Sequence, residues 1–187
     1  MVQSFAQIMF TPGVKALQER HGSRASYSRI EERAGHERTL LGESEAAFIS
    51  ARDSFYMASV SETGWPYVQH RGGPPGFLKV LDERTIGFAE FRGNRQYVST
   101  GNLLHDERVS LILMDYPNRR RLKLLGRAQI LEREEEPEAV ARLELPDYRA
   151  HVERGFVIEV MAFDWNCPQH IVPRYTAAEF ARHRNDA

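Results

Sequence analysis

From residue 55 onward, short apolar segments follow one another at close spacing, and this pattern limits the possible folds more than any other. Turn-forming residues separate the segments, as in Ser61-Glu62-Thr63-Gly64. Short strands joined by tight turns are typical of an antiparallel sandwich or barrel, because a parallel sheet needs longer crossover segments. The pattern predicts strands over residues 55–60, 65–69, 77–81, 85–91, 109–115, 121–131 and 155–163.

Helical patterns flank this β-rich region. Thr11 can cap a helix that Pro12 begins and Gly22 ends in a left-handed conformation. Residues 23–40 are polar, and we expect them to form an extended arm or loop. The sequence therefore predicts an N-terminal helix and arm over residues 1–40 and a β domain over residues 41–187. Further helices are expected over residues 44–52, over 96–104 with Val98 facing inward, over 134–145 and over 176–184.

The composition excludes several classes of protein. Cys167 is the only cysteine, so neither an intramolecular disulfide nor a CxxC zinc site is expected. The net charge of −1 and the interspersed charges predict no nucleic-acid or anionic-membrane partner. The N-terminal MVQSFAQIMFTPG lacks the basic residues of a secretory signal, and no segment has the roughly 20 apolar residues of a membrane span. A cytoplasmic protein is therefore expected.

The segment RGGPPG at residues 71–76 is the first candidate ligand site. Glycines and prolines at the end of a strand form a kinked loop with free backbone N–H groups, which a flat ligand can approach closely. Arg71 stands at the entrance of this loop and is suited to a phosphate. The alternative is an ordinary hairpin loop.

The segment FAEFRGNRQ at residues 88–96 is the second candidate. A strand ends here, Gly93 turns the chain, and a helix is expected to begin near Asn94. Backbone N–H groups at a helix N-terminus bind phosphate, and Arg95 adds a forked cationic donor. The alternative is a capped helix with a surface arginine.

Two later segments could also carry chemistry. In RRLKLLGRA, residues 120–128, a glycine inside a strand indicates a bulge or a close backbone approach, although an exposed strand face is the alternative. After the last strand, Cys167 and His170 lie three residues apart. A nucleophilic pair is conceivable, but no third orienting residue is evident, so we expect this segment to line a ligand pocket.

In this order, the motifs resemble those of the pyridoxamine 5′-phosphate oxidase-related family, and more closely those of its flavin-nucleotide-binding branch. The resemblance covers residues 55–173. It rests on Arg71 before the glycine-rich kink and on the turn Gly93-Asn94-Arg95. It continues with RVSL at 108–111, GRA at 126–128 and the Cys-Pro-x-x-Ile pattern at 167–171.

The resemblance implies a mainly β fold, a six-stranded antiparallel Greek-key split barrel with flanking helices, assembled as a homodimer with FMN at the interface. Arg71, Arg95 and Asn94 would hold the phosphate, and Arg121 would reach the flavin from the partner subunit. The main chain at Gly72, Gly73, Phe88 and Ala89 would line the remainder of the cofactor. The residues implied to bind FMN are Arg71, Gly72, Gly73, Phe88, Ala89, Asn94, Arg95, Gln96, Arg121, Cys167, Gln169 and His170.

Two departures argue against oxidation of pyridoxamine 5′-phosphate itself. Gln96 stands where the oxidases carry a lysine, and residues 179–184 lack their tryptophan- and arginine-bearing C-terminal segment. We therefore expect an FMN-dependent oxidoreductase that uses a donor such as NAD(P)H and an unspecified small substrate. No GxGxxG fingerprint is present, so a nicotinamide would stack on the flavin directly.

Other ligands and roles remain as alternatives to this expectation. One is a non-catalytic flavin carrier or sensor, and another is deazaflavin F420 on the same barrel. A third is haem, with an axial ligand among His70, His105, His151 and His170.

Overall fold

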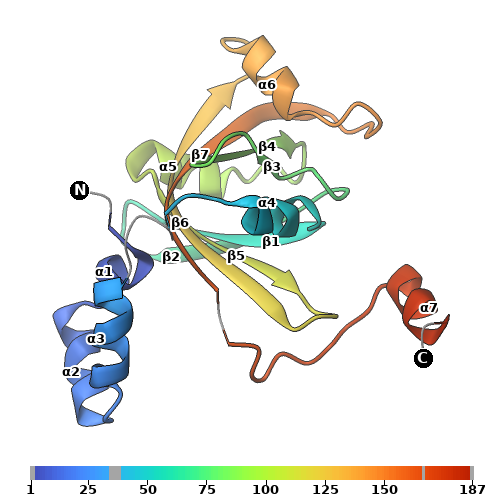
Figure 1. Cartoon of the computed structure of the whole chain (residues 1–187). Helices are drawn as coiled ribbons and strands as arrows, with labels where there is room; N and C mark the ends of the chain where they lie inside the picture. Colours follow the sequence, from blue (N-terminus) through green and yellow to red (C-terminus); the bar gives the residue numbers. More distant parts are fainter. Residues whose placement is uncertain (1–2, 34–38, 166, 186–187) are drawn as a thin grey trace.

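Seven antiparallel strands form one curved sheet in the computed structural model, which describes residues 3–33, 39–165 and 167–185. The strand order is β2-β1-β5-β6-β7-β4-β3, so β2 and β3 form the two edges (Figure 1). The mainly β fold with flanking helices is confirmed, as are the seven strands that the sequence pattern predicts, whereas the six strands that the resemblance implies are one too few. The strands are β1 Ser54–Val60, β2 Pro66–Gly72, β3 Lys79–Val80, β4 Thr85–Phe91, β5 Arg108–Asp115, β6 Arg120–Glu132 and β7 Val152–Trp165.

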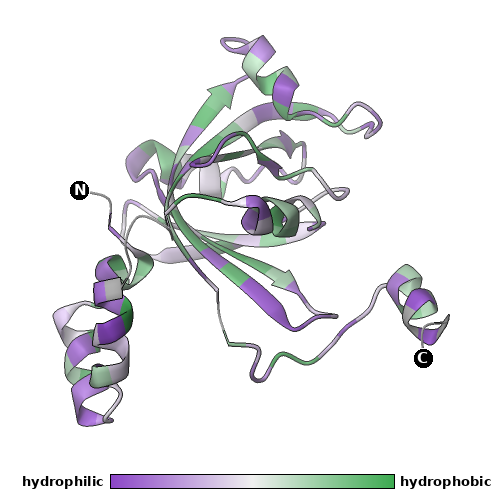
Figure 2. Cartoon of the chain, in the orientation of Figure 1, coloured by the Kyte–Doolittle hydropathy of each residue, from purple (hydrophilic) through white to green (hydrophobic). Residues whose placement is uncertain are grey.

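Alternating apolar residues place one face of each strand in the core. In β5, Val109, Leu111 and Leu113 are buried, and in β6 Leu122 and Leu124 are buried beside charged neighbours. This period of two is the pattern of a half-buried strand. Figure 2 shows the alternation of hydrophobic and hydrophilic residues along the ribbon.

Aromatic side chains fill the core beneath β4. The rings of Phe88 and Phe156 stack with centroids 5.0 Å apart, and Phe55 packs edge-on against Phe88. Each fully buried phenylalanine contributes about 1.5–3 kcal/mol to stability. The expected strand over residues 77–81 is only partly formed, because Phe77 and Leu78 turn into this core and leave only β3 paired.

Three helices group at one side of the sheet (Figure 1). Thr11 caps α2, Pro12–Arg20, as expected, and Gly22 follows it with a φ of 72°. The expected extended arm over residues 23–40 is wrong in its first part, because α3, Arg24–Arg33, is helical. Glu31 of α3 accepts hydrogen bonds from Lys15 and Arg24 and so ties α3 to α2. The short α1, Phe5–Met9, was not expected, and residues 34–38 of the expected arm lie outside the described residues.

The other helices begin and end near their expected positions. Val98 was expected to face inward but is 37% exposed, because α5 begins at Val98 itself and buries Ser99, Asn102 and Leu103 instead. No helix in the described ranges is long and apolar enough to cross a membrane. The helices found near their expected positions are α4 Glu43–Ser50, α5 Val98–His105, α6 Pro137–Leu143 and α7 Ala177–Asn185.

Candidate functional site

A small polar cavity lies where β2, the end of β4, the start of α5 and β7 meet. Its volume is about 50 Å³, which is on the scale of a phosphate group. Arginine, glutamate, amide and hydroxyl groups predominate in its lining. The lining residues are Gln69, Arg71, Glu90, Phe91, Gly93, Asn94, Arg95, Gln96, Tyr97, Ser99, Thr100 and Glu153.

The loop between β4 and α5 is shaped by local hydrogen bonding. The side-chain oxygen of Asn94 accepts a hydrogen bond from the backbone N–H of Gln96 at 3.2 Å. Arg95 and Tyr97 adopt left-handed conformations, with φ of 61° and 53°, although neither is glycine. A left-handed conformation of a residue other than glycine costs on the order of 1 kcal/mol in conformational energy, and such conformations are concentrated at functional sites. The helix therefore begins at Val98, not near Asn94 as expected, and its first turn reaches the cavity through Ser99 and Thr100.

An ionic triad of Arg71, Glu90 and Arg154 lies at the inner side of the cavity, and Arg71 and Glu90 line it. Nη1 of Arg71 donates a 2.6 Å hydrogen bond to Oε1 of Glu90, and each side chain is only 10% exposed. Nε of Arg154 lies 3.4 Å from Oε2 of Glu90, close enough for an ion pair but without a hydrogen bond. The Arg71 guanidinium also lies 5.2 Å from the ring centroid of Phe156. Two buried arginines thus share one carboxylate.

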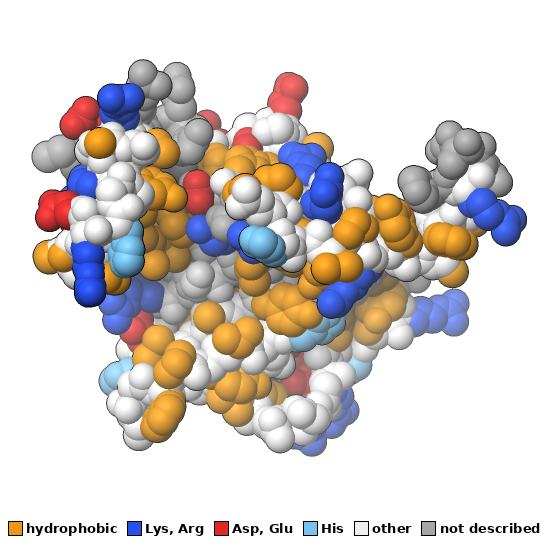
Figure 3. Space-filling model, turned by 90° about the horizontal axis from the view of Figure 1, so that it is seen from below, with side chains coloured by type: hydrophobic (Ala, Val, Ile, Leu, Met, Phe, Trp, Pro, Cys, Tyr) orange, Lys and Arg blue, Asp and Glu red, His pale blue; other side chains and the backbone are white. Residues whose placement is uncertain are grey.

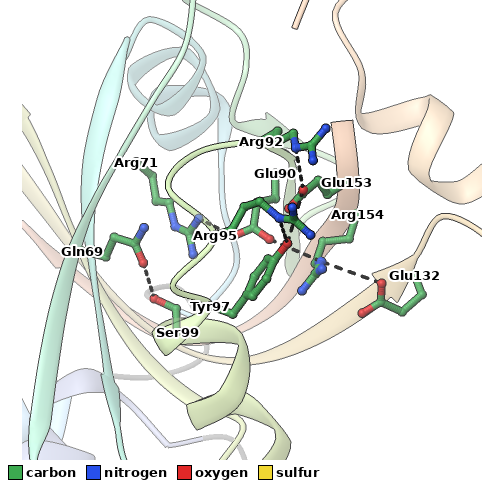
Figure 4. A network of polar contacts seen from close by, with 10 residues as sticks. All are labelled: Gln69, Arg71, Glu90, Arg92, Arg95, Tyr97, Ser99, Glu132, Glu153 and Arg154. Carbon is green, nitrogen blue, oxygen red and sulfur yellow. Dashed lines mark hydrogen bonds and ion pairs between the residues drawn. The ribbon is translucent and has the colours of Figure 1, made fainter. Parts of the chain in front are cut away.

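The outer wall is a second chain of polar contacts (Figure 4). Nε of Arg95 donates to the Tyr97 hydroxyl at 3.0 Å, and that hydroxyl donates to Glu153 at 3.4 Å. Arg92 pairs with the same glutamate at 3.5 Å. The hydrogen bond to Tyr97 raises the pKa of Arg95, so this exposed guanidinium stays charged.

The cavity contains unused hydrogen-bonding groups. Nε of Arg71 and Oγ1 of Thr100 are buried and have no hydrogen-bond partner. Such orphan groups are costly unless a ligand or water satisfies them. Two arginines, Arg71 and Arg95, and two glutamates, Glu90 and Glu153, line the cavity, so the charges of the lining balance. A ligand with several acceptor oxygens would accept hydrogen bonds from the two orphan groups, and the residues of the cavity therefore fit the phosphate of FMN.

Four of the residues expected from the sequence meet at this cavity, namely Arg71, Asn94, Arg95 and Gln96. Phe88 and Ala89 were expected to contact the cofactor through their main chain beyond the phosphate, and neither lines this cavity; their side chains are buried in the core. Gly73 lies against Phe77 so closely that a Cβ there would be 2.8 Å from that side chain. The glycine therefore makes room for a core phenylalanine, and it is not in the cavity lining, and neither is Gly72.

The remaining expected residues lie elsewhere in the single chain. Arg121 is on β6 opposite Met114, with its Nε buried and unpartnered. Cys167 lines a different cavity of about 470 Å³ between the N-terminal helices and β6 and β7. Gln169 and His170 are exposed and do not line the phosphate-sized cavity.

The sequence did not identify several residues of the cavity, and their signals differ. Gln69 could have been found, because it lies two residues before Arg71 and therefore on the same face of β2. Its side-chain oxygen accepts a 2.7 Å hydrogen bond from Ser99. Glu153 is 56 residues from its partner Tyr97, so only the pairing of β4 with β7 brings it to the site.

An open antiparallel sheet of this order with an anion-sized cavity is the arrangement of a split-barrel protein. Residues 41–164 match the family model described as pyridoxamine 5′-phosphate oxidase, which covers well over half of the chain. The chain belongs to this family. No curated protein matches the chain.

Solved structures share the fold at low sequence identity. HupZ of Group A Streptococcus is 14% identical with a TM-score of 0.54, over 73% of this chain and all of that one. An FMN-binding protein from Syntrophomonas wolfei is 14% identical with a TM-score of 0.50, over 80% of this chain and 97% of that one. Protein Rv2991 of Mycobacterium tuberculosis is 20% identical with a TM-score of 0.51, over 75% of this chain and 94% of that one.

Proposed function

We propose that this protein binds FMN and transfers electrons or hydride between a donor such as NAD(P)H and a small substrate. The observation that carries the proposal is the pair of buried, unpartnered groups, Arg71 Nε and Thr100 Oγ1, in a cavity that two arginines line. A phosphate monoester carries about −1.5 to −2 charges at neutral pH and three acceptor oxygens. It would accept hydrogen bonds from both orphan groups.

The residues that would hold the phosphate come from three elements. Arg71 of β2 provides a largely buried guanidinium, and Arg95 provides an exposed one from the loop in which Asn94 and Gln96 are its neighbours. Thr100 adds a hydroxyl from the first turn of α5. With the phosphate in this cavity, the ring system of the cofactor would extend from its open side.

The bound flavin would supply the redox chemistry, and the chain would supply binding and orientation. The acids that line the cavity, Glu90 and Glu153, are each engaged with arginines. No side chain is therefore assigned as an acid or base. The same observation favours the second candidate, a flavin carrier or sensor that does not catalyse a reaction.

We infer that two copies of the chain complete the site. Tyr56, Val60 and Val68 are exposed apolar residues on β1 and β2, and they belong to one face of the paired strands. Exposed apolar groups of this kind are typical of protein interfaces. Figure 3 shows hydrophobic side chains spread over the surface between the N-terminal helices and α7. In such a homodimer, Arg121 and the segment from Cys167 to His170 would reach the flavin held by the other copy.

The visible absorption spectrum of the purified protein, before and after addition of FMN, tests the proposal. A two-banded flavin spectrum that is released as FMN on denaturation is expected. Anaerobic bleaching by NADH or NADPH would support the oxidoreductase, whereas retained FMN that no donor reduces would support the carrier or sensor. A colourless protein that ignores FMN would contradict both, and F420 and haem would then be tested. None of His70, His105, His151 and His170 lines the cavity.

A further inference from the structure

Glu90 has an unusual position for a carboxylate. It lies near the end of β4, opposite Arg154 in the pairing of β4 with β7, and is 9% exposed. Its Oε1 accepts the 2.6 Å hydrogen bond from Arg71, while its Oε2 faces Arg154 at 3.4 Å without a hydrogen bond. Burial of a charge is costly unless the charge is paired, so the position requires both arginines.

The contact with Glu90 fixes the orientation of Arg71. This arginine projects from the edge strand β2, where no neighbouring strand covers the far side. Its guanidinium lies 5.2 and 5.7 Å from the ring centroids of Phe156 and Phe88. Its Nη1 is bound to Glu90, whereas its Nε has no partner. Glu90 therefore holds one end of the guanidinium and leaves donor capacity for a ligand.

We propose that Glu90 is a positioning residue, which orients Arg71 toward the phosphate of the bound nucleotide. This inference rests on the proposed function, because it assumes that the cavity takes a phosphate. Glu90 acts through Arg71 and does not touch the ligand itself. FMN carries the phosphate that Arg71 would bind and riboflavin does not, so loss of the Glu90 contact should weaken the binding of FMN alone.

The burial of Glu90 argues against the opposite role, in which Glu90 competes with the phosphate. Arg71 and Arg154 carry two positive charges, and Glu90 and Glu132 carry two negative charges, because Glu132 also pairs with Arg154. The cluster is therefore neutral while Glu90 stays paired with Arg71. Displacement of Glu90 by a phosphate would strand a carboxylate that is 9% exposed, which is unfavourable.

The test compares the affinities of wild type and Glu90→Gln for FMN and for riboflavin, measured by flavin fluorescence quenching. Glutamine keeps the size of the side chain and removes its charge. We expect the dissociation constant for FMN to rise about tenfold or more, as for loss of one charge-assisted hydrogen bond, and that for riboflavin to stay unchanged. Added inorganic phosphate should compete with FMN more weakly in the variant than in wild type.

Glu132→Gln is the matched control, because Glu132 also faces Arg154, at 3.7 Å, but is 42% exposed in its side chain. It should leave both affinities unchanged. If Glu90→Gln does not fold, Glu90→Asp keeps the charge and shortens its reach, and the same comparison applies. The inference would be overturned if the variant bound FMN and riboflavin more weakly to the same extent, if both affinities stayed unchanged, or if FMN bound more tightly. Wild type that binds no FMN would instead overturn the proposed function.

Discussion

Trp165 Nε1 donates a 2.8 Å hydrogen bond to Oε1 of Glu45, which joins the last residue of β7 to helix α4. The second carboxylate oxygen of Glu45 accepts a 3.1 Å hydrogen bond from the backbone of Gly42. The indole ring packs edge-on against Phe48, with centroids 4.7 Å apart. These contacts hold α4 against the sheet by a residue near the start of the family match and a residue directly after its end.

This relationship predicts a pH dependence of stability. Burial raises the pKa of Glu45. The hydrogen bonds from Trp165, from Ser44 and from the backbone of Gly42 and Glu45 lower the pKa by more than burial raises it, so the net shift is downward. A carboxyl whose folded pKa is lowered stabilises the fold above its unfolded pKa of about 4.3, and this stabilisation is lost as the pH falls through the folded pKa. The free-energy difference between wild type and Glu45→Gln should therefore be larger at pH 7 than at pH 3.5, measured by urea denaturation. Glu62→Gln, in an exposed turn, is the control, and an equal difference at both pH values would contradict the prediction.

Gly126 should tolerate no side chain. The strand pairing of β6 with β7 shifts register between Leu125 and Gly126. A Cβ at Gly126 would lie 2.5 Å from Ile158 Cγ2 and 2.7 Å from the carbonyl oxygen of Glu159. Gly126→Ala should therefore destabilise the protein by about 1–3 kcal/mol, as overpacking does, with a lower Tm in thermal unfolding.

Gly13→Ala is the matched control for that substitution. Gly13 lies in α2, and a Cβ there would meet nothing within 4 Å. Alanine is favoured over glycine in a helix by up to about 1 kcal/mol, so this variant should be as stable as wild type or slightly more stable. Similar stability of the two variants would show that Gly126 is not tightly packed.

The strands could be predicted from the sequence because their signals are local. Val109, Leu111 and Leu113 alternate with more exposed neighbours, and this period of two identifies β5 without any tertiary information. The bulge at Gly126 followed from the same reasoning, since glycine is unfavourable inside a regular strand. Errors arose where tertiary contacts decide the outcome. Phe77 looks like a strand residue but turns into the core, and α3 is polar yet is tied to α2 through Glu31.

The residues of the candidate site likewise divide into those that local sequence patterns predict and those that depend on tertiary contacts. Arg71 and Arg95 were identified because arginine beside glycine-rich turns is a local pattern. Glu90 was not identified from the sequence, because its role depends on Arg154 of β7. Only the pairing of β4 with β7 brings Arg154 beside it. The helix start was placed too early, since the left-handed conformation of Tyr97 cannot be deduced from its side chain.

A buried hydrogen bond fixes helix α5 to the sheet and gives a third prediction. Asn102 Nδ2 donates to Ser59 Oγ at 2.9 Å, and the two residues are 7% and 2% exposed. Asn102→Ala would leave the Ser59 hydroxyl without this donor, so a loss of about 1–3 kcal/mol in the free energy of unfolding is expected. Leu104→Ala, on an exposed position of the same helix, should have little effect by the same denaturation measurement.

The last prediction concerns the exposed arginine of the phosphate cavity. Arg95 is held by Tyr97 and stays charged, so it is placed to make a charge-assisted contact with a phosphate. Such a contact is worth about 1.5–3 kcal/mol, and Arg95→Ala should therefore weaken FMN binding by about tenfold to a hundredfold in equilibrium titration. Arg182→Ala, in α7 and outside the lining of the cavity, should leave the affinity unchanged. An Arg95 variant that binds FMN as tightly as wild type would exclude Arg95 from the phosphate site while leaving Arg71 to be tested by itself.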